Sequence, residues 1–492
     1  MGGGTHSSSG KDAVSNTSLV KESGFIGGVW VSSDKTYPVY DPATDKVIAN
    51  IADLGTDDFK RAINQADVAF RDFSKSSEYE RSHMLHKLAA LMRSNAKDLA
   101  VILTLENGKT LAEAEGEVEY GASFISWFAE EAIRSYGDIV PSQHEGSTNF
   151  IIREPIGVCA IIAPWNFPIA MITRKLGPAL AAGCTVVVKP PSETPLSALA
   201  LTVLALEAGF PPNVIQVVPT KDRAAVAELY TNPVIKKVSF TGSTSVGKMI
   251  TAKAADTMKK VSMELGGNAP FIVFDDADLA KAIDGVVVCK YRCSGQTCVC
   301  ANRLFVQRGI HDKFVAALVD RVQQFKLGSG MDPTVTHGPL VNQAAVAKVK
   351  SHIDDAVNRG AKLILGGKVR NDLGKCFVEP AILIGVTTDM LVARDETFGP
   401  LAPIFVFDTI DDVLKMANDT EFGLAGYAFA ENLKTIWRVS RELEVGMIGI
   451  NTGKISASEA PFGGIKESGL GKEGSKYGLA EFQIMKNITF NV

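Results

Sequence analysis

The segment SGQTCVCANR places Cys298 among small and polar residues instead of within an apolar run. Most lone cysteines are buried and pack as small apolar side chains. The neighbours Gly295 and Gln296 indicate instead a loop, where a thiol can attack a carbonyl carbon as a nucleophile. Cys300 follows two residues later, close enough for a strained disulfide bond with Cys298. This pair is the first candidate for chemistry.

Two other segments carry groups that such a nucleophile needs. Glu264 opens the run ELGGN, where two glycines allow a sharp turn beside a carboxylate that could act as a general base. Asn166 in APWNFP is fixed between Pro164 and Pro168, a rigid presentation of an amide donor for an oxyanion. A surface glutamate and an ordinary turn asparagine are the commoner outcomes of these patterns. The residues alone therefore leave both roles open.

A glycine-bearing turn offers a place for a phosphate. The run SFTGSTSVGK puts Gly242 after an apolar segment and Gly247 in the first turn of a helix. Backbone N–H groups at such a helix start bind phosphate oxygens, but Thr244 replaces the middle glycine of the dinucleotide fingerprint. A plain strand-to-helix turn is an equal alternative. Lys189 ends another apolar run, where it could reach a ribose or phosphate or remain a solvated lysine.

The elements that must position these residues follow from the spacing of apolar residues. From residue 158 onward, short apolar runs alternate with longer amphipathic ones, which predicts βαβ units and a parallel sheet. Gly183 and Gly209 are expected to end two of the helices. The expected strands are 158–163, 185–189, 214–218 and 236–240, and the expected helices are 169–182, 195–208 and one from about Ser245. This pattern predicts a doubly wound nucleotide-binding domain.

A second α/β series begins near Glu264 and predicts another domain. It contains an expected strand at 271–274, a helix from about Asp276, a strand around Leu304 and a helix over 311–325. Residues 136–155 differ, because a polar loop lies between two short apolar segments. That pattern predicts a hairpin, which could serve as an arm for pairing of subunits.

Composition limits the classes of partner. The 492 residues are 46% hydrophobic with a formal charge of −4, as expected of a globular protein of two or three domains. Acidic and basic residues nearly balance, so the sequence predicts neither a nucleic-acid surface nor a membrane anchor. No apolar run is long enough to cross a bilayer. Small molecules are the expected partners.

The cysteines and histidines indicate a reducing compartment and no metal. Seven cysteines, four of them between Cys289 and Cys300, are not a disulfide framework, and seven scattered histidines do not suggest a zinc site. Residues 1–20 lack the patterns of a signal or transit peptide and are expected to form a flexible tail. We expect a cytoplasmic protein, or a mitochondrial-matrix protein if a presequence has been removed.

Several runs resemble the signature blocks of the aldehyde dehydrogenase superfamily and occur in that family's order: PWNFP, FTGSTSVG, MELGGN, GQTC, ETFGP and PFGGIKESGLGKEG. The resemblance covers the chain from about residue 20 to its end. It implies that Cys298 is the nucleophile, that Asn166 and the backbone N–H of Cys298 form the oxyanion hole, and that Glu264 is the general base. Attack on an aldehyde would give a thiohemiacetal, hydride transfer to a nicotinamide would leave a thioester, and water would release the acid.

The same resemblance implies a nicotinamide dinucleotide against the helix after the Gly242 turn, with Lys189 near the adenosine ribose and Glu396 at the nicotinamide ribose. Trp165 and Ser243 are expected to line this site. NAD-preferring relatives often carry an acid at the position of Ser192, which repels the 2′-phosphate of NADP. Because serine removes this repulsion, we expect NADP to be accepted and preferred over NAD.

Within the superfamily, the blocks MITRKLGPAL, KYRCSGQTCVC and NTGKIS are most similar to the succinate-semialdehyde dehydrogenases. The similarity implies that Arg174, Arg292 and Ser456 bind a carboxylate at the far end of the substrate, although a surface ion pair is the usual role of a lone arginine. Arg174 lies eight residues beyond Asn166, so a helix would put both on roughly one face. The family also suggests that Cys298 and Cys300 join reversibly under oxidation.

We therefore expect an α/β protein of the aldehyde dehydrogenase type in three parts. These are a Rossmann-type nucleotide-binding domain (21–134 and 156–262), an α/β catalytic domain (263–460) and a small β oligomerisation element (135–155 and 470–492). The expected reaction is oxidation of succinate semialdehyde to succinate with NAD(P), as in 4-aminobutyrate degradation, by a homodimer or homotetramer. The alternatives are a dehydrogenase for another carboxylated aldehyde such as glutarate semialdehyde, a non-catalytic family member, and a cysteine hydrolase.

Overall fold

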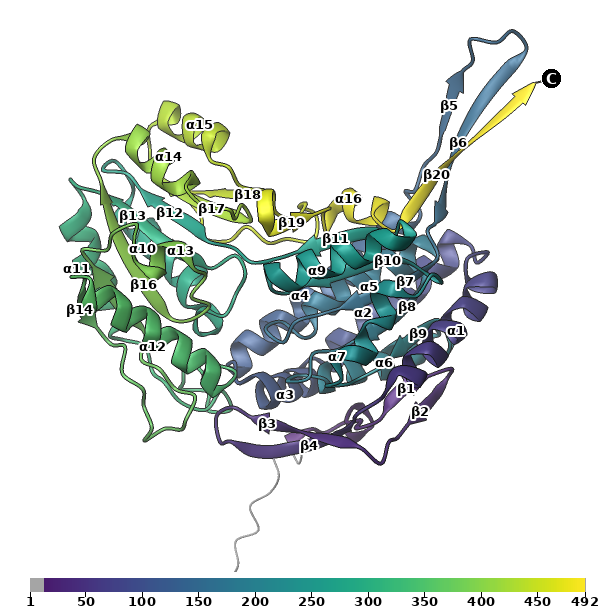
Figure 1. The fold of residues 1–492 in the computed structure, drawn as a ribbon, viewed down its shortest axis with the longest axis horizontal. Coiled ribbons are helices and arrows are strands. Elements are labelled where there is room, and N and C mark those ends of the chain that lie inside the picture. The colour runs from purple at the N-terminus through teal and green to yellow at the C-terminus, as the bar shows by residue number, and fades with distance from the viewer. Residues whose placement is uncertain (1–12, 492) are drawn as a thin grey trace, which may run out of the picture.

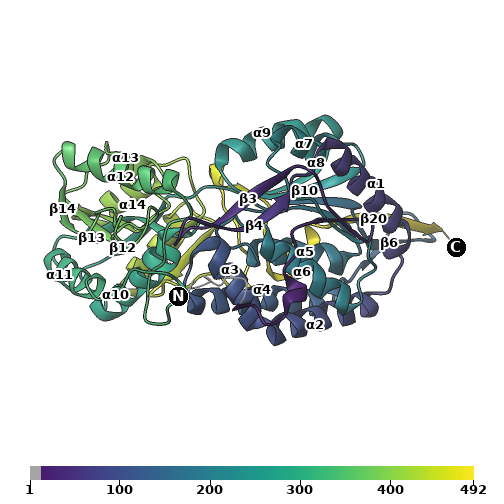
Figure 2. The same cartoon turned by 90° about the horizontal axis from the view of Figure 1, so that it is seen from below.

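The computed structural model describes residues 13–491, which form two lobes and a projecting arm (Figure 1). Figure 2 shows the two lobes side by side, with the arm at the end of the molecule away from the second lobe. No helix in the described part of the chain is long and apolar enough to cross a membrane.

The first lobe is built on an eight-stranded sheet. Its strands are β1 (Gly24–Ile26), β2 (Val29–Val31), β7 (Val158–Ile162), β8 (Thr185–Lys189), β9 (Ile215–Val217), β10 (Ile235–Thr241), β11 (Lys260–Glu264) and β19 (Gly469–Leu470). They lie in the order β19-β11-β10-β7-β8-β9-β1-β2, and the run from β11 to β9 is parallel. The chain reverses its direction of travel across the sheet between β7 and β10, and ligands bind beyond the strand ends at such a switch point.

Helices cover both faces of this sheet, and a short two-stranded ribbon, β3 (Thr36–Asp41) with β4 (Lys46–Ala52), runs along the base of the molecule (Figure 1). The helices of this lobe are α1 (Thr56–Phe73), α2 (Glu78–Ser94), α3 (Ala96–Asn107), α4 (Leu111–Ala132), α5 (Ala170–Ala182), α6 (Leu196–Ala208), α7 (Arg223–Val226), α8 (Glu228–Thr231), α9 (Thr244–Ala254) and α16 (Ser475–Ala480).

The elements expected over residues 158–254 are confirmed, each to within one residue at its ends. The strands were predictable because parallel strands buried on both faces are continuous apolar runs, as in β7, where every residue is buried. Gly183 and Gly209 adopt left-handed φ angles of 92° and 103° and end α5 and α6 as expected.

Two buried glutamates hold the starts of the helices that follow β7 and β8. Glu117 of α4 accepts hydrogen bonds from the N–H groups of Ile169 (2.9 Å) and Ala170 (3.2 Å) at the start of α5. Glu106 of α3 accepts two N–H groups at the start of α6, at 2.7 and 2.9 Å. Each carboxylate satisfies donors that the first turn of a helix leaves without a partner. The loops after β7 and β8 are thereby tied to α4 and α3.

The second lobe contains a seven-stranded sheet in the order β14-β15-β16-β13-β12-β17-β18. Its strands are β12 (Ala269–Val273), β13 (Ala301–Gln307), β14 (Lys362–Leu365), β15 (Ala381–Ile384), β16 (Leu401–Phe407), β17 (Ala425–Phe429) and β18 (Met447–Ile450). Its helices are α10 (Leu279–Val286), α11 (His311–Val322), α12 (Gln343–Asn358), α13 (Leu391–Arg394), α14 (Ile410–Asn418) and α15 (Leu433–Glu442). The expected second α/β series is confirmed, although α10 begins three residues later than Asp276 because Asp278 caps it through the N–H of Lys281 (3.1 Å).

The arm is a three-stranded antiparallel sheet that confirms the expected hairpin. β5 (Asp138–Pro141) pairs with β6 (Ser147–Pro155), and β20 (Gln483–Asn491) pairs with the whole length of β6. Figure 1 shows this sheet extending away from the body of the molecule. It leaves large apolar side chains in solvent, including Ile139 and Met485, which are 72% and 71% exposed.

Two expectations about the ends of the chain are wrong. Residues 13–20, assigned to a flexible tail, are ordered: Val14 and Leu19 are buried in the core of the first lobe, and Asp98 accepts the N–H groups of Ser15 and Asn16. The rest of the expected tail lies outside the described residues. Residues 470–480 belong to the first lobe and not to the arm, because β19 pairs with β11 and α16 packs against α4 and α5.

Candidate active site

A strained turn presents Cys298 to the space between the lobes. Cys298 follows the turn η5 (Arg292–Gly295), in which three successive residues are left-handed: Cys293 (φ 51°), Ser294 (φ 54°) and Gly295 (φ 76°). This backbone conformation is unfavourable for residues other than glycine, so contacts with neighbouring residues must stabilise the turn. Glu113 accepts the N–H of Cys293 at 2.6 Å, and the Ser294 hydroxyl donates to Gly338 O at 2.7 Å.

A cavity of about 390 Å³ lies where the two lobes meet, at the switch point between β7 and β10. Six residues expected in the site line it: Trp165 and Asn166 after β7, Gly242 and Ser243 after β10, and Cys298 and Glu396 from the second lobe. The sheet order thus brings together segments that are far apart in the sequence. Thr241 and Lys348 also line this cavity and were not predicted.

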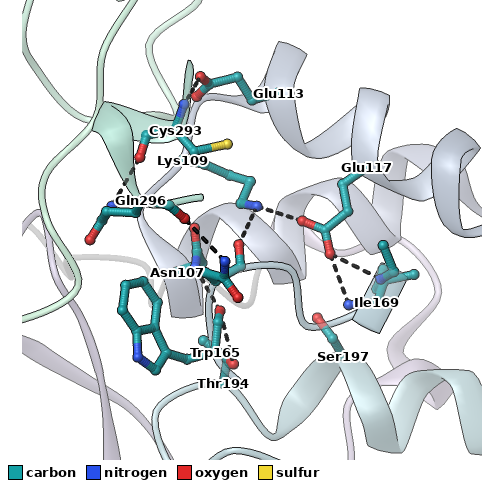
Figure 3. Close-up of polar contacts among 12 residues, drawn as sticks. Asn107, Lys109, Glu113, Glu117, Trp165, Ile169, Thr194, Ser197, Cys293 and Gln296 are labelled. Atoms are coloured by element: carbon teal, nitrogen blue, oxygen red, sulfur yellow. Dashed lines mark hydrogen bonds and ion pairs between the residues drawn. The ribbon is translucent and has the colours of Figure 1, made fainter. Parts of the chain in front are cut away.

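A buried polar network fixes the loop that carries Trp165 and Asn166 (Figure 3). Lys109 Nζ donates to Asn166 O at 2.8 Å and to the Glu117 carboxylate at 2.5 Å, and the Asn107 amide donates to Trp165 O at 2.9 Å. The Asn166 amide donates to Gln296 O at 3.1 Å, which joins this loop to the nucleophile's loop. Because an amide nitrogen has two N–H groups, one remains for an oxyanion.

The expectation that Asn166 and Arg174 share a helix face is wrong. Asn166 lies in the loop before α5, whereas Arg174 lies within that helix. The prolines on either side of Asn166 and the Glu117 cap delay the start of α5 until Ala170. Both side chains still line the site, Asn166 from a loop and Arg174 from a helix.

Glu264 ends β11 and is buried beside Cys298. Its Oε2 accepts the Thr241 hydroxyl at 3.0 Å and lies 3.5 Å from Arg174 Nη2, while its Oε1 has no hydrogen-bond partner among residues 13–491. The glycines of ELGGN allow this close packing. A Cβ atom at Gly267 would lie 2.7 Å from the carbonyl oxygen of Cys298.

Burial raises the pKa of the Cys298 thiol well above its usual range, and the charge of Glu264 raises it further. The thiol is therefore protonated at neutral pH in the free protein, with a carboxylate in contact with it. Glu396, on the opposite wall of the cavity, accepts the N–H of Gly267 at 3.3 Å, and burial raises its pKa to about 7.

Charged residues that the sequence reasoning missed lie directly behind Glu264. Glu473 forms ion pairs with Arg174 at 2.6 Å and with Lys175 at 2.7 Å, and Lys175 donates to the Thr241 hydroxyl at 2.6 Å. All these side chains are nearly inaccessible to solvent. The adjacent pair Arg174–Lys175 within an otherwise apolar helix was the signal, because buried cations require buried acids.

The expected substrate residues meet on the other side of Cys298. A second cavity of about 20 Å³ is lined by Arg174, Arg292, Cys298 and Ser456, with Tyr120, Phe167, Met171 and Phe462 among its other walls. Arg174 is paired with Glu473, whereas Arg292 makes no ion pair with any described residue and is exposed, its guanidinium 5.4 Å from the centre of the Phe167 ring. Arg292 is therefore the open cation of this cavity.

The remaining expected residues are not among those that line the large cavity. Lys189 ends β8, and burial lowers the pKa of its ammonium group. Ser192 lines a neighbouring hollow of about 160 Å³ with Glu193 and Lys221, and its hydroxyl donates to Glu193 at 3.1 Å. Cys300 is a buried free thiol that donates to Lys290 O at 3.0 Å, so its disulfide with Cys298 stays a prediction.

Comparison with known proteins agrees with this geometry. Residues 30–488 match the model of the aldehyde dehydrogenase family. The chain belongs to the aldehyde dehydrogenase family. This confirms the expected fold and the expected enzyme class, an NAD(P)-dependent oxidoreductase.

Three relatives show how close the similarity is. This aldehyde dehydrogenase is 49% identical to the NADP(+) succinate-semialdehyde dehydrogenase 1 of Schizosaccharomyces pombe, over 95% of this chain and 94% of the relative. It is 51% identical to a glutarate-semialdehyde dehydrogenase of Pseudomonas aeruginosa, over 96% of this chain and 98% of that protein. A succinate-semialdehyde dehydrogenase structure from Burkholderia pseudomallei superposes with a TM-score of 0.96 at 49% identity, covering 98% of this chain and all of the other.

The raised pKa of Cys298 has a consequence for its reactivity. Alkylation of Cys298 in this aldehyde dehydrogenase by iodoacetamide is expected to be slow at pH 7 and to rise throughout the alkaline range, because only the thiolate reacts. Glu264→Gln removes the charge that opposes thiolate formation, so its alkylation profile shifts to lower pH. Peptide mass spectrometry at Cys298 measures both rates. A profile that shifts to higher pH in Glu264→Gln would contradict the assigned contact.

Proposed function

We propose that this chain oxidises succinate semialdehyde to succinate with NAD(P), as in 4-aminobutyrate degradation, through a thiohemiacetal and a thioester on Cys298. The observation that carries the proposal is the position of Cys298 on the walls of two cavities. The larger one lies at the switch point and is lined by the start of α9, and the smaller one is lined by two arginines. An aldehyde with a distal carboxylate can place its carbonyl at the thiol and its charge beside Arg292.

The residues around the thiol supply the groups that the reaction requires. Attack needs the Cys298 thiolate, which forms when the thiol gives its proton to solvent water. The free N–H of the Asn166 amide and the backbone N–H of Cys298 would hold the oxyanion of the thiohemiacetal. A bound nicotinamide dinucleotide supplies the hydride acceptor. Glu264 then activates the water that hydrolyses the thioester, as general-base catalysis requires.

The wall residues of the larger cavity fit a dinucleotide. Ser243, the residue before α9, makes no side-chain cap, so first-turn N–H groups of this helix remain for a phosphate. Glu396 is an acceptor for ribose hydroxyl groups, and Trp165 provides an apolar face. These contacts support the nucleotide-binding role of the switch point.

Substrate charge provides the first test. Succinate semialdehyde is expected to have a kcat/KM about a hundredfold above that of butanal, because a charge-assisted hydrogen bond in a closed site has this scale. Arg292→Met is expected to remove most of this preference by lowering kcat/KM for the semialdehyde alone. Arg308→Met, a change of another exposed arginine far from both cavities, is the matched control. Equal rates for the two aldehydes in the wild-type enzyme would exclude the proposed substrate.

Chain length separates the proposal from its closest alternative. The two arginines would also accept glutarate semialdehyde, and one relative bears that name. The small cavity favours the shorter substrate, since about 20 Å³ leaves little space beyond the carboxylate itself.

We further propose that NADP is preferred over NAD. Ser192 places a hydroxyl instead of an acid in the hollow beside the main cavity, and Lys221 is a cation on the same wall. Three acidic residues of this hollow oppose a 2′-phosphate: Glu193, Asp45 and Glu106.

Charge changes in this hollow test the preference. Ser192→Glu is expected to lower the ratio of kcat/KM for NADP to that for NAD by about tenfold or more, since one nearby like charge contributes at least about 1.4 kcal/mol in such a site. Glu193→Gln is expected to raise the same ratio. Steady-state kinetics with both cofactors measure it, and an unchanged ratio in both variants would contradict this placement of the 2′-phosphate.

We propose that the arm, β5 with β6 and β20, joins subunits into a homodimer or homotetramer. An isolated three-stranded sheet with exposed Ile139, Met485 and Phe490 is stable only if another surface covers it. A reducing compartment such as the cytoplasm fits the seven free thiols.

One substitution on the arm tests the assembly. Met485→Glu is expected to lower the molar mass in solution by at least half at micromolar concentration, because it places a charge in the proposed interface. Met258→Glu, at a methionine that is 88% exposed on the first lobe, is expected to leave the assembly unchanged. Light scattering after size-exclusion chromatography measures both, and an oligomer that persists in Met485→Glu contradicts the assigned role.

A further inference from the structure

Tyr120 lies on α4 and forms part of the wall of the small cavity beside Cys298. Its hydroxyl oxygen is buried and makes no hydrogen bond with any residue in the described part of the chain. The ring packs edge-on against Phe124, with 5.0 Å between the ring centres, so it cannot turn freely toward another partner. A buried hydroxyl without a partner is unfavourable, and most buried polar groups in folded proteins are paired.

The surroundings of this hydroxyl select the kind of group that it can bind. Ser456 and both arginines of the cavity are its polar neighbours. A hydroxyl beside two guanidinium groups cannot find an acceptor in them, because guanidinium groups only donate. Of these neighbours, only the Ser456 hydroxyl could accept, but it makes no hydrogen bond with Tyr120 by distance and angle. An acceptor that enters the cavity would satisfy the Tyr120 hydroxyl, and the positive surroundings favour an anion.

The uncompensated positive charge of the cavity comes mainly from Arg292. Arg174 is held by Glu473 at 2.6 Å and lies 3.5 Å from Glu264, so acids already balance its charge. Arg292 is open, but one exposed arginine alone would bind a flexible carboxylate without fixing its position. A donor on the opposite wall would fix both the position and the orientation of the bound group.

We propose that Tyr120 is a specificity-determining residue whose hydroxyl donates a hydrogen bond to the anionic end of the aldehyde substrate, while Arg292 supplies the opposite charge. This inference rests on the proposed function and assigns a contact within that same site. The cavity holds little more than one or two water-sized groups, so a carboxylate there must touch its walls. The tyrosine acts on binding of the charged end and not on the reacting carbonyl.

The test compares Tyr120→Phe with wild type, using succinate semialdehyde and butanal at saturating cofactor. Tyr120→Phe removes only the hydroxyl. We expect its kcat/KM for succinate semialdehyde to fall about tenfold or more through KM, since a hydrogen bond to a charged group is lost. The value for butanal should change less than about twofold, because that substrate brings no acceptor to the hydroxyl.

Tyr37→Phe is the matched control, because the Tyr37 hydroxyl is also buried without a partner but lies outside the cavity. Tyr37→Phe should leave kcat/KM unchanged for both substrates. Succinate is a second probe: the rise in thermal midpoint that it causes in wild type should shrink in Tyr120→Phe. Without ligand, the midpoint of Tyr120→Phe should not fall, since an unpaired buried hydroxyl stabilises nothing.

The outcomes separate this inference from the proposed function. If wild type prefers succinate semialdehyde and Tyr120→Phe keeps the same preference and the same response to succinate, the tyrosine contact is wrong and the proposed function stands. If Tyr120→Phe lowers kcat/KM equally for both substrates, or unfolds at a lower temperature without ligand, the role of Tyr120 is structural and the inference is overturned. If wild type shows no preference over butanal, both fail together.

Discussion

The buried ion pair between Lys109 and Glu117 connects the fold to the chemistry. Glu117 binds the first N–H groups of α5, and Lys109 binds the carbonyl oxygen of Asn166 in the loop just before that helix. Loss of either partner would leave a buried charge without compensation, which typically costs about 3–5 kcal/mol. The pair therefore fixes where α5 starts, and with it the positions of Asn166, the proposed oxyanion donor, and of Arg174 farther along the helix. Both lobes depend on this loop, because the Asn166 amide also holds the backbone of Gln296 near the nucleophile.

The charges around the nucleophile have a consistent arrangement. Arg174 and Lys175 face Glu473 and Glu264, directly or through the Thr241 hydroxyl, so two cations are matched by two acids behind the thiol. This balance keeps a carboxylate buried beside Cys298 in contact with cations. Arg174, which we propose to bind the substrate, also lies 3.5 Å from Glu264 and helps to orient this carboxylate. Arg292 has no acidic partner among residues 13–491, so it is available to pair with an anionic ligand.

The strands and helices around the switch point could be predicted because local pattern determines them. The run 185–189 is buried on both faces and reads as a strand, and Gly183 can adopt the left-handed backbone that ends α5. Cys298, Glu264 and Asn166 could be selected because each lies in an unusual local sequence, and the resemblance to a family supplied their roles. The ordered segment around Leu19 was missed because a three-residue 3-10 turn in a polar stretch has no detectable period.

Contacts between distant segments were the part that the sequence did not reveal. Glu473 meets Arg174 only because β19 and α16 return to the first lobe, and Tyr120 reaches the substrate cavity only because α4 packs along α5. Neither residue stands out in its own segment. The helix-face argument for Asn166 and Arg174 failed for a related reason, since the buried cap on α5 comes from a residue about fifty positions earlier in the chain. Local sequence periodicity cannot predict helix caps and ion pairs between residues that are far apart in the chain.

The central claim is that Cys298 carries the acyl group and that Glu264 activates the water that removes it. Glu264→Gln keeps the size of the side chain but cannot take a proton, so it should stop the reaction after the thioester has formed. The measurement is intact-protein and peptide mass spectrometry after Glu264→Gln is mixed with succinate semialdehyde and NADP, with Cys298→Ser as the control. The account predicts a succinyl group on Cys298 in nearly every active subunit and none in the control. Turnover of Glu264→Gln at the wild-type rate, or an acyl group on another residue, would contradict it.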